Sequence, residues 1–437
     1  MKRRTIAAPA VIASLALALA GCSGGTEPTG NSTSGSGGAE TITMSAWNVA
    51  ATPEFQVLVD GFNATGPEYE VEIVEYDTAE YDTQMVADLA AGTAPDIVTQ
   101  KNQSYFYTYA DGGQLMDVSD ILGDIQDNAS LELFQVDGAT YAVPYRQDQW
   151  ILFYNKDLFA AAGVEEPNGA WTWDDYEEAA AALTTGVADS SGAFGTYQHS
   201  WNASVQGFAN AQVDGADPLS GDFEFYQPYY ERALRMQDDG SQETFGNTTT
   251  NQLHYTSEFG TQKAAMTLMG SWFVASLIAM QESGDADDFE WSIAPAPQLD
   301  ASLGYPDGTP RTFGNPTGLG INPAIDEAKV ATAKEFLTWS ASSEAAQLLA
   351  GIGITPAIVT DEVVEAFFAT EGAPQDDVAR WTFSNRQITP EHPNSAFTPG
   401  IWTILGDMHS AIMSESEGVD PAISAAQDRA ANEVLDS

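Results

Sequence analysis

The 437-residue chain carries 63 acidic and 15 basic side chains, which gives a formal net charge of −48 at pH 7. A surface this acidic repels nucleic acids, phosphates and polyanionic substrates, so these are excluded as partners. Hydrophobic residues make up 43% of the chain and aromatic residues 11%, as in an ordinary globular protein with enough residues for two domains.

The N-terminal residues predict export from the cytoplasm. Lys2, Arg3 and Arg4 precede an apolar stretch over residues 6–20 and a pair of small residues. This order is typical of a secretory signal peptide, which we assign to residues 1–21. The apolar stretch is shorter than the ~20 residues that a membrane-spanning helix needs.

A flexible tether is predicted to follow, over residues 22–39. Residues 23–38 are Ser, Gly, Thr and Asn apart from Glu27 and Pro28, and such a composition cannot fill a core. Cys22 is the only cysteine, which excludes an internal disulfide bond. The stretch Leu19-Ala20-Gly21-Cys22 resembles the lipobox of bacterial lipoproteins, in which the cysteine is lipidated and becomes the mature N-terminus. The resemblance implies that Cys22 anchors the protein in lipid on the extracytoplasmic face of the cell membrane.

Strands and helices are predicted to alternate between residues 42 and 99. Alternating apolar residues indicate a strand over 42–47, and Thr52, as an N-cap followed by Pro53, is typical of the start of a helix with apolar residues at helical spacing. A strand over 71–74, a helix from Tyr81 that ends at Gly92 and a strand over 95–99 follow. This order predicts an α/β domain with a largely parallel sheet. Ligands bind at the carboxyl ends of such strands, where the sequence places Trp47, Asn48, Gln100, Asn102 and Gln103.

The rest of the chain adds further helices and an aromatic segment. Residues 141–155 are predicted to be extended, and a helix is predicted to open at Thr172 with a capping box to Asp175. Proline and glycine make residues 295–316 irregular, and helices resume at Asp326 and at Ser343 before a stop over 351–356. The four histidines lack the spacing of a zinc-binding helix, and motifs for nucleotide binding or a nucleophilic serine are absent from the sequence. No metal ion or cofactor is therefore expected.

Three stretches of the sequence resemble the extracellular solute-binding proteins of ABC transporters, family 1, of the maltose/maltodextrin-binding type. They are Tyr141-Ala142-Val143-Pro144-Tyr145 with Leu152-Phe153-Tyr154-Asn155 and Trp171-Thr172-Trp173, then Ala264-Ala265-Met266 with Gly270-Ser271-Trp272, and finally Gly318-Leu319-Gly320-Ile321-Asn322 with Gly353-Ile354-Thr355-Pro356.

The resemblance implies a two-lobed, periplasmic-binding-protein-like α/β fold with the ligand in the cleft between the lobes. It implies crossovers near residues 146–148, 294–297 and 353–356. Lobe 1 is then expected to comprise residues 40–147 and 297–353, and lobe 2 residues 148–296 and 354–437. It also implies closure on an oligosaccharide, delivery to ABC permease subunits in the membrane, no catalysis, and action as a monomer.

Candidate ligand residues follow from what a sugar offers, which is hydroxyl groups and a face of C–H bonds. The resemblance aligns Trp272 with a sugar-stacking tryptophan and Asp148 with a sugar-binding carboxylate. It suggests Trp201 and Trp402 as further stacking residues, although each could equally pack in a core. Gln103, with Gln100 and Asn102, replaces an acid of the family by an amide. Arg146 either binds the ligand or pairs with an acid, and Trp47 either lines the cleft or packs beneath it.

Two other interpretations of the sequence remain open. The acidity suits solubility in a saline or cell-wall environment, but it would also attract a cationic solute such as a polyamine. A cell-surface glycosidase needs only two facing carboxylates, which 63 acidic residues could supply.

Overall fold

The computed structural model describes residues 41–435 apart from residue 51 and residues 126–128. The predicted signal peptide, the tether and Cys22 lie outside the described residues. None of the helices in the described part combines the length and the apolar character that a membrane span requires.

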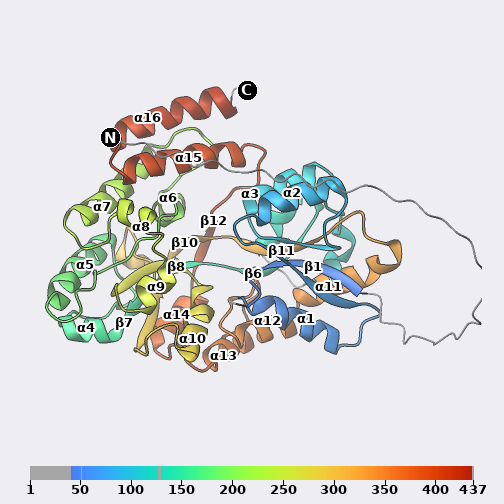
Figure 1. Ribbon diagram of the computed structural model, residues 1–437, viewed down its shortest axis with the longest axis horizontal. Coiled ribbons are helices and arrows are strands. Elements are labelled where there is room, and N and C mark those ends of the chain that lie inside the picture. The colour runs from blue at the N-terminus through green and yellow to red at the C-terminus, as the bar shows by residue number, and fades with distance from the viewer. Residues whose placement is uncertain (1–40, 51, 126–128, 436–437) are drawn as a thin grey trace, which may run out of the picture. The chain divides into compact units, whose positions relative to one another are not determined.

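Strands and helices alternate along the first third of the chain, and helices dominate the rest of it (Figure 1). The strands are β1 (Thr41–Trp47), β2 (Glu70–Tyr76), β3 (Ile97–Gln100), β4 (Gln135–Val136), β5 (Ala139–Thr140), β6 (Val143–Gln147), β7 (Trp150–Asn155), β8 (Met266–Gly270), β9 (Trp291–Pro295), β10 (Arg311–Gly314), β11 (Pro316–Ile321) and β12 (Gln387–Pro390). The helices are α1 (Glu54–Ala64), α2 (Tyr81–Ala91), α3 (Gln103–Asp111), α4 (Lys156–Ala162), α5 (Trp173–Val187), α6 (Ala203–Gln212), α7 (Gln227–Asp238), α8 (Phe245–Thr250), α9 (Tyr255–Gly260), α10 (Phe273–Ser283), α11 (Val330–Ser340), α12 (Ser343–Ala350), α13 (Asp361–Phe368), α14 (Asp377–Ser384), α15 (Thr398–Met413) and α16 (Val419–Arg429).

The first sheet has the strand order β2-β1-β3-β11-β6. β1 pairs in parallel with β2 and β3, whereas β11 is antiparallel to β3 and to β6. All residues of β3 and β11 are buried, as expected for central strands that are covered on both faces. One hydrophobic core surrounds this sheet and includes residues of α1, α2, α3 and α11. We call this sheet with its core the first lobe.

The second sheet has the order β8-β7-β9, and both outer strands are antiparallel to β7. Every residue of its three strands is buried. A second hydrophobic core surrounds it and takes residues from α4 to α7 and from α13 to α16. We call this sheet with its core the second lobe, and Figure 1 shows the two groups of elements on opposite sides of β6.

The chain passes from the first lobe to the second between β6 and β7. β6 ends at Gln147 in the first sheet and β7 begins at Trp150 in the second, so Asp148 and Gln149 connect the two sheets. This position agrees with the crossover that the resemblance implied near residues 146–148. A residue here belongs to neither sheet, and its side chain is free to face the space between the lobes.

A second passage occurs at Asn315, between β10 and β11. β10 pairs with β12, and Phe313 is part of the second core, so the segment after β9 stays with the second lobe up to this point. The resemblance had implied this crossover near residues 294–297, which lie well before it. A Cβ atom on Gly314 would lie 2.0 Å from the carbonyl oxygen of Asp148, so the two passing segments touch through their backbones.

A third passage follows α12 and lies beside the first. Ile354 belongs to the first core and Ile358 to the second. The amide of Gln147 donates to the carbonyl of Thr355 at 3.2 Å, and the amide of Asp148 donates to the carbonyl of Asn315 at 3.1 Å. The passing segments are therefore hydrogen-bonded to one another as a narrow connection between the lobes.

Most of the predicted local elements are confirmed, but one predicted cap is wrong, and β10 is a strand within residues 295–316, which were predicted to be irregular. Thr172 and Asp175 form the predicted capping box at the start of α5, and Gly92 ends α2 in the left-handed conformation with φ of 69°. Thr52 is not the N-cap of α1. Pro53 holds that position with helical torsion angles, and no side chain caps the helix there.

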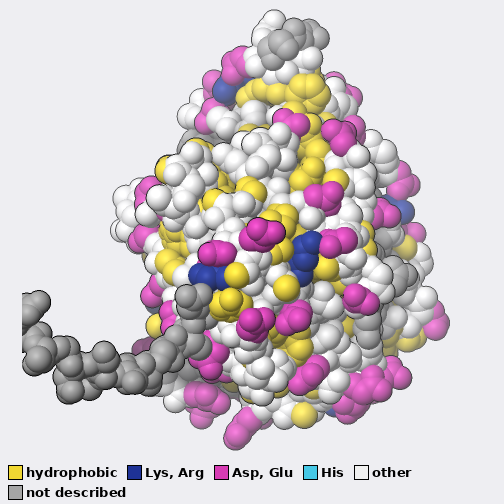
Figure 2. Space-filling view, turned by 90° about the vertical axis from the view of Figure 1, so that its right-hand side faces the viewer, with side chains coloured by type: hydrophobic (Ala, Val, Ile, Leu, Met, Phe, Trp, Pro, Cys, Tyr) yellow, Lys and Arg dark blue, Asp and Glu magenta, His cyan; other side chains and the backbone are white. Residues whose placement is uncertain are grey.

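The surface is acidic over the face that Figure 2 displays. Asp and Glu side chains are scattered across that face, whereas Lys and Arg side chains are few. This distribution agrees with the net charge of −48 and leaves no basic patch for a polyanion on that face.

Candidate functional site

A cleft of about 820 Å³ lies between the two lobes. Trp47 and Glu54 line it from the first lobe, and Trp201 and Trp272 line it from the second. Asp148 lines it from the passing segment itself. Since the cleft draws on both lobes, a molecule bound in it would contact each of them.

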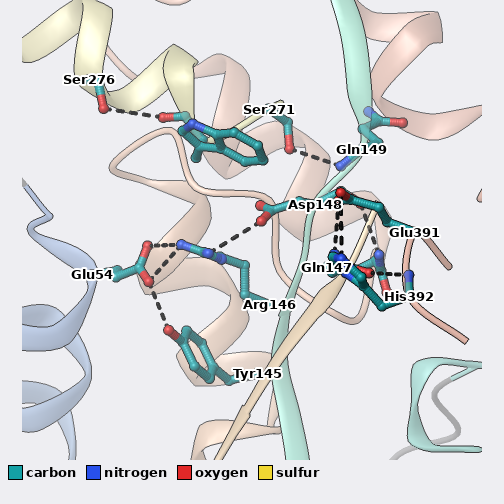
Figure 3. A network of polar contacts seen from close by, with 12 residues as sticks. Glu54, Tyr145, Arg146, Gln147, Asp148, Gln149, Ser271, Ser276, Glu391 and His392 are labelled. Atoms are coloured by element: carbon teal, nitrogen blue, oxygen red, sulfur yellow. Dashed lines mark hydrogen bonds and ion pairs between the residues drawn. The ribbon is translucent and has the colours of Figure 1, made fainter. Parts of the chain in front are cut away.

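A buried ion-pair network forms one end of the cleft (Figure 3). Nη1 of Arg146 donates to both carboxylate oxygens of Glu54, at 2.7 and 2.6 Å, and Tyr145 donates its hydroxyl to the same carboxylate at 2.7 Å. Nη2 of Arg146 lies 3.2 Å from Oδ2 of Asp148. The guanidinium group is therefore shared between two carboxylates, and Glu54 is the more fully bonded of the two.

Asp148 is left with an unused oxygen. Its residue is only 6% exposed, and Oδ1 has no hydrogen-bond partner among the described residues. Burial raises the pKa of Asp148 to about 6, against the opposing effect of Arg146. A buried carboxylate oxygen without a donor is costly, so this atom is suited to accept a hydrogen bond from a bound ligand.

Glu391, just after β12, brings a further carboxyl group to the cleft. The side-chain amide of Asn315 donates to its Oε2 at 3.0 Å, and the ring of His392 lies 3.8 Å from its Oε1. Burial raises the pKa of Glu391 to about 7, and the charge of Asp148 acts in the same direction. His392 is neutral, because burial lowers its pKa to about 3. Neither the ring nor the amide therefore supplies Glu391 with a full positive charge.

Aromatic side chains form the wall on the second lobe. Trp272 donates its indole N–H to the hydroxyl of Tyr255 at 3.2 Å, and its ring meets the ring of Trp150 edge to face at 5.9 Å between centroids. The ring of Trp201 lies 6.4 Å from that of Trp150 and 6.1 Å from that of Tyr255. Trp201 is 42% exposed, which is unusual for so large an apolar side chain. The wall therefore offers aromatic surface that the fold does not cover.

Gly270 makes room for this wall. A Cβ atom at Gly270 would lie 1.8 Å from the ring of Trp272, which is far inside van der Waals contact. The tryptophan ring thus lies directly against the backbone of β8. Any side chain at position 270 would push the ring out of its place.

The end of β1 forms the edge of the first lobe. Trp47 packs edge to face against Phe55 and Tyr81, and Asn48 follows it in a left-handed conformation with φ of 45°. Lys101 donates to the carbonyl of Thr78 at 2.6 Å, and burial lowers its pKa. Trp47, Asn48, Thr78 and Lys101 line the cleft.

The structure separates the predicted ligand residues into two groups. Those that line the cleft are Trp47, Asn48, Arg146, Asp148, Trp201 and Trp272, and their contact with a ligand stays a prediction. Gln100, Asn102, Gln103 and Trp402 are not part of its lining.

Each of the latter residues has another partner within the fold. Gln100 and Gln103 are buried and donate to the carbonyls of Val98 and Leu133. The side chain of Asn102 accepts from the amide of Ser104 and caps α3. The ring of Trp402 lies 4.5 Å from that of His392.

Several cleft residues were missed from the sequence. In the sequence Glu54 is only an acid in the first turn of a helix, and nothing near Glu391 or Asn315 marks them as site residues. Tyr255 lies in a region without a recognisable motif. Within the described residues, no cluster of three or more His, Cys, Asp or Glu side chains could hold a metal ion.

Comparisons with known proteins agree with this geometry. A model of the bacterial extracellular solute-binding proteins matches residues 57–378. An uncharacterised lipoprotein from Streptomyces antibioticus is 31% identical over 183 residues, which is 40% of this chain and 38% of that protein. The diacetylchitobiose-binding protein of Streptomyces coelicolor is 30% identical over 172 residues, which is 38% of this chain and 40% of that protein. The chain thus spans about two fifths of the length of these relatives.

A solved structure matches over a much larger share of the chain. A sugar transporter from Rhizobium etli, in an open conformation, superposes with a TM-score of 0.76 at 28% identity. The match covers 90% of this chain and 100% of that one. The two-lobed α/β arrangement predicted from the sequence is thereby confirmed.

Proposed function

Because this chain belongs to the bacterial extracellular solute-binding proteins, we propose that it is the ligand-capturing component of an ABC importer and that it binds an oligosaccharide. One observation carries the choice of ligand. The same cleft combines uncovered aromatic surface at Trp201 and Trp272 with a buried carboxylate oxygen on Asp148 that has no partner among the described residues. Aromatic rings suit the C–H face of a sugar, and a carboxylate accepts from its hydroxyl groups.

The relatives support the same class of ligand. One is named for binding diacetylchitobiose, and the matching structure is described as a sugar transporter. Delivery to permease subunits in the membrane follows from the role of the family, and we propose that the protein acts as a monomer.

The two alternatives are less well supported. Family and fold are those of solute-binding proteins, which are not enzymes, so we propose that the protein does not cleave its ligand. Incubation with a labelled oligosaccharide should then leave its length unchanged, whereas shorter products would indicate a glycosidase. A polyamine binder would be stabilised by spermidine and by no sugar.

A thermal-shift panel of α- and β-linked oligosaccharides tests the proposal directly. A ligand that binds only the folded state raises its stability by ~2.7 kcal/mol at a hundredfold excess over Kd. We expect at least one oligosaccharide to raise the melting temperature and spermidine to leave it unchanged. A panel in which no sugar has an effect would contradict the proposal.

Closure of the lobes on the ligand is expected to make the protein more compact. The passing segments at Asp148, Asn315 and Thr355 are hydrogen-bonded side by side, which makes them a natural hinge between two separate cores. We predict a smaller radius of gyration in solution scattering at saturation with a tightly bound sugar. Non-binding sugar at the same concentration is the control, and identical profiles would remove closure from the mechanism.

We also propose that Cys22 anchors the protein in the membrane by lipidation. The support is the lipobox-like stretch that ends at Cys22 and the description of one relative as a lipoprotein. We predict that Cys22→Ala either releases the protein into the medium or leaves an uncleaved precursor, while the neighbouring Ser23→Ala stays anchored. Membrane fractionation checks this, and a mature, fully membrane-bound Cys22→Ala variant would disprove the anchor.

A further inference from the structure

The cleft holds more negative than positive charge close to Asp148. Glu54, Asp148 and Glu391 each bring a carboxyl group, and Arg146 is the cation bonded between the first two. Lys101 also lines the cleft, but its ammonium group donates to the carbonyl of Thr78 and lies 4.0 Å from Asp82. When all of these carboxyl groups are ionised, the single guanidinium group does not neutralise them.

The unmatched charge lies on Asp148 and Glu391. Arg146 directs Nη1 to Glu54 and only Nη2 to Asp148, which leaves Oδ1 of Asp148 without a donor among the described residues. Among the described residues, the carboxylate of Glu391 receives one hydrogen bond, from the neutral side-chain amide of Asn315. The backbone amide of Asp148 donates to the carbonyl of Asn315, whose side-chain amide donates to Glu391, so Asn315 is bonded to both residues. Both acids line the same cleft, and they are near enough for the charge of Asp148 to raise the pKa of Glu391.

We propose that the oligosaccharide bound in this cleft carries a basic amino group, and that Asp148 and Glu391 together hold this group. This inference rests on the proposed function and narrows its ligand to amino sugars with a free amine. An ammonium group has three donors and a full charge, so it can bond to Oδ1 of Asp148 and to the carboxylate of Glu391 at once.

The titration of the two acids supports this assignment. Burial raises the pKa of Glu391 to about 7 and that of Asp148 to about 6, so the ligand-free pair retains a proton near neutral pH. The titratable groups that face the pair are Arg146, Glu54, the neutral His392 and the neutral hydroxyl groups of Tyr145 and Tyr255. A ligand cation favours the ionised carboxylates and lowers their pKa, so its binding should release the proton.

The aromatic wall distinguishes an amino sugar from a bare polyamine. Trp272, Tyr255 and Trp201 offer ring surface in the same cleft as the two acids. This surface suits the C–H face of a sugar ring, while the acids suit its amine. The acidic surface of the protein adds a long-range attraction for a cationic ligand.

Matched ligands test the proposal. Glucosamine oligomers carry free amines, and their N-acetylated counterparts have the same skeleton without charge. We expect calorimetry near pH 6, in buffers of different ionisation enthalpy, to show that the free amines bind at least ~10-fold more tightly and release protons. Glu391→Gln keeps the shape of the side chain and should remove most of this preference. Glu335→Gln, an exposed acid on α11, is the control and should preserve it.

The remaining outcomes would each contradict the amino-sugar inference. Equal or tighter binding of the acetylated oligomers, no binding of the free amines, or a preference that survives Glu391→Gln overturns the inference. If neutral sugars still bind in these cases, oligosaccharide binding stands as the proposed function, and only the inference of an amino sugar fails. Binding of spermidine but of no sugar, charged or neutral, contradicts the inference and the proposed function together.

Discussion

Replacing Trp272 by alanine is expected to weaken oligosaccharide binding by at least ~10-fold, which corresponds to 1.4 kcal/mol. The ring lies against the backbone of Gly270 and is held by a hydrogen bond to Tyr255, so its face is preorganised in the cleft. Stacking of aromatic pairs contributes ~0.5–1.5 kcal/mol beyond burial of area, and the lost burial of the ring adds to this. Isothermal calorimetry with the sugar that gives the largest thermal shift measures the effect.

Two variants control for non-specific damage. Trp272→Phe keeps a ring but loses the indole N–H, so it should retain part of the affinity. Trp381→Ala removes a half-buried tryptophan that donates to the carbonyl of Pro306 away from the cleft, and it should leave the affinity unchanged. Wild-type affinity in Trp272→Ala would mean that the ligand does not use this wall.

Replacing Asp148 by alanine is expected to weaken binding by at least ~10-fold as well. A hydrogen bond to a charged group contributes ~1.5–3 kcal/mol, and Oδ1 of Asp148 has no donor within the described part of the chain. Asp148→Asn keeps the shape but loses the charge, so it should lose much of the affinity for a neutral sugar. For a cationic ligand, the loss should also depend on salt, because ion pairing is screened.

Asp148→Asn should weaken ligand binding but raise the stability of the ligand-free protein. The pKa of Asp148 rises from 3.8 to about 6 on folding, so ionising it in the folded state costs roughly 3 kcal/mol. A raised carboxyl pKa means stability that is present below about pH 4 and is lost as the pH rises through about 6. Asp148→Asn should therefore gain stability relative to wild type at pH 8, and less so at pH 4. Thermal melts at both pH values check this, and a destabilised variant at pH 8 would contradict it.

The helix ends could be predicted from the sequence because the residues that determine each of them lie within a few positions of one another. The capping box of α5 lies within Thr172–Asp175, and the left-handed end of α2 needs only Gly92. The second passage between the lobes could not be placed in this way. It depends on β10 pairing with β12, more than seventy residues later, and on Phe313 entering the second core. No short window of sequence contains that information.

The site was predictable only in part, for the same reason. Trp272 and Asp148 were identified through the resemblance to a family, and both line the cleft. Glu54 and Glu391 were not, since their partners Arg146 and Asn315 are 92 and 76 residues away. Asn102 directly precedes α3, and an N-cap role could have been predicted for it there.

The place of Asp148 in a passing segment has a mechanical consequence. A rotation of the lobes about that segment moves Trp47 relative to Trp272, because each lies wholly in one lobe, but it leaves Asp148 on the axis. A contact on the axis has no lever arm, so it exerts no torque on the lobes. If the lobes close as proposed, Asp148 would hold the ligand in the open and in the closed state alike, and groups far from the axis would do the work of closing.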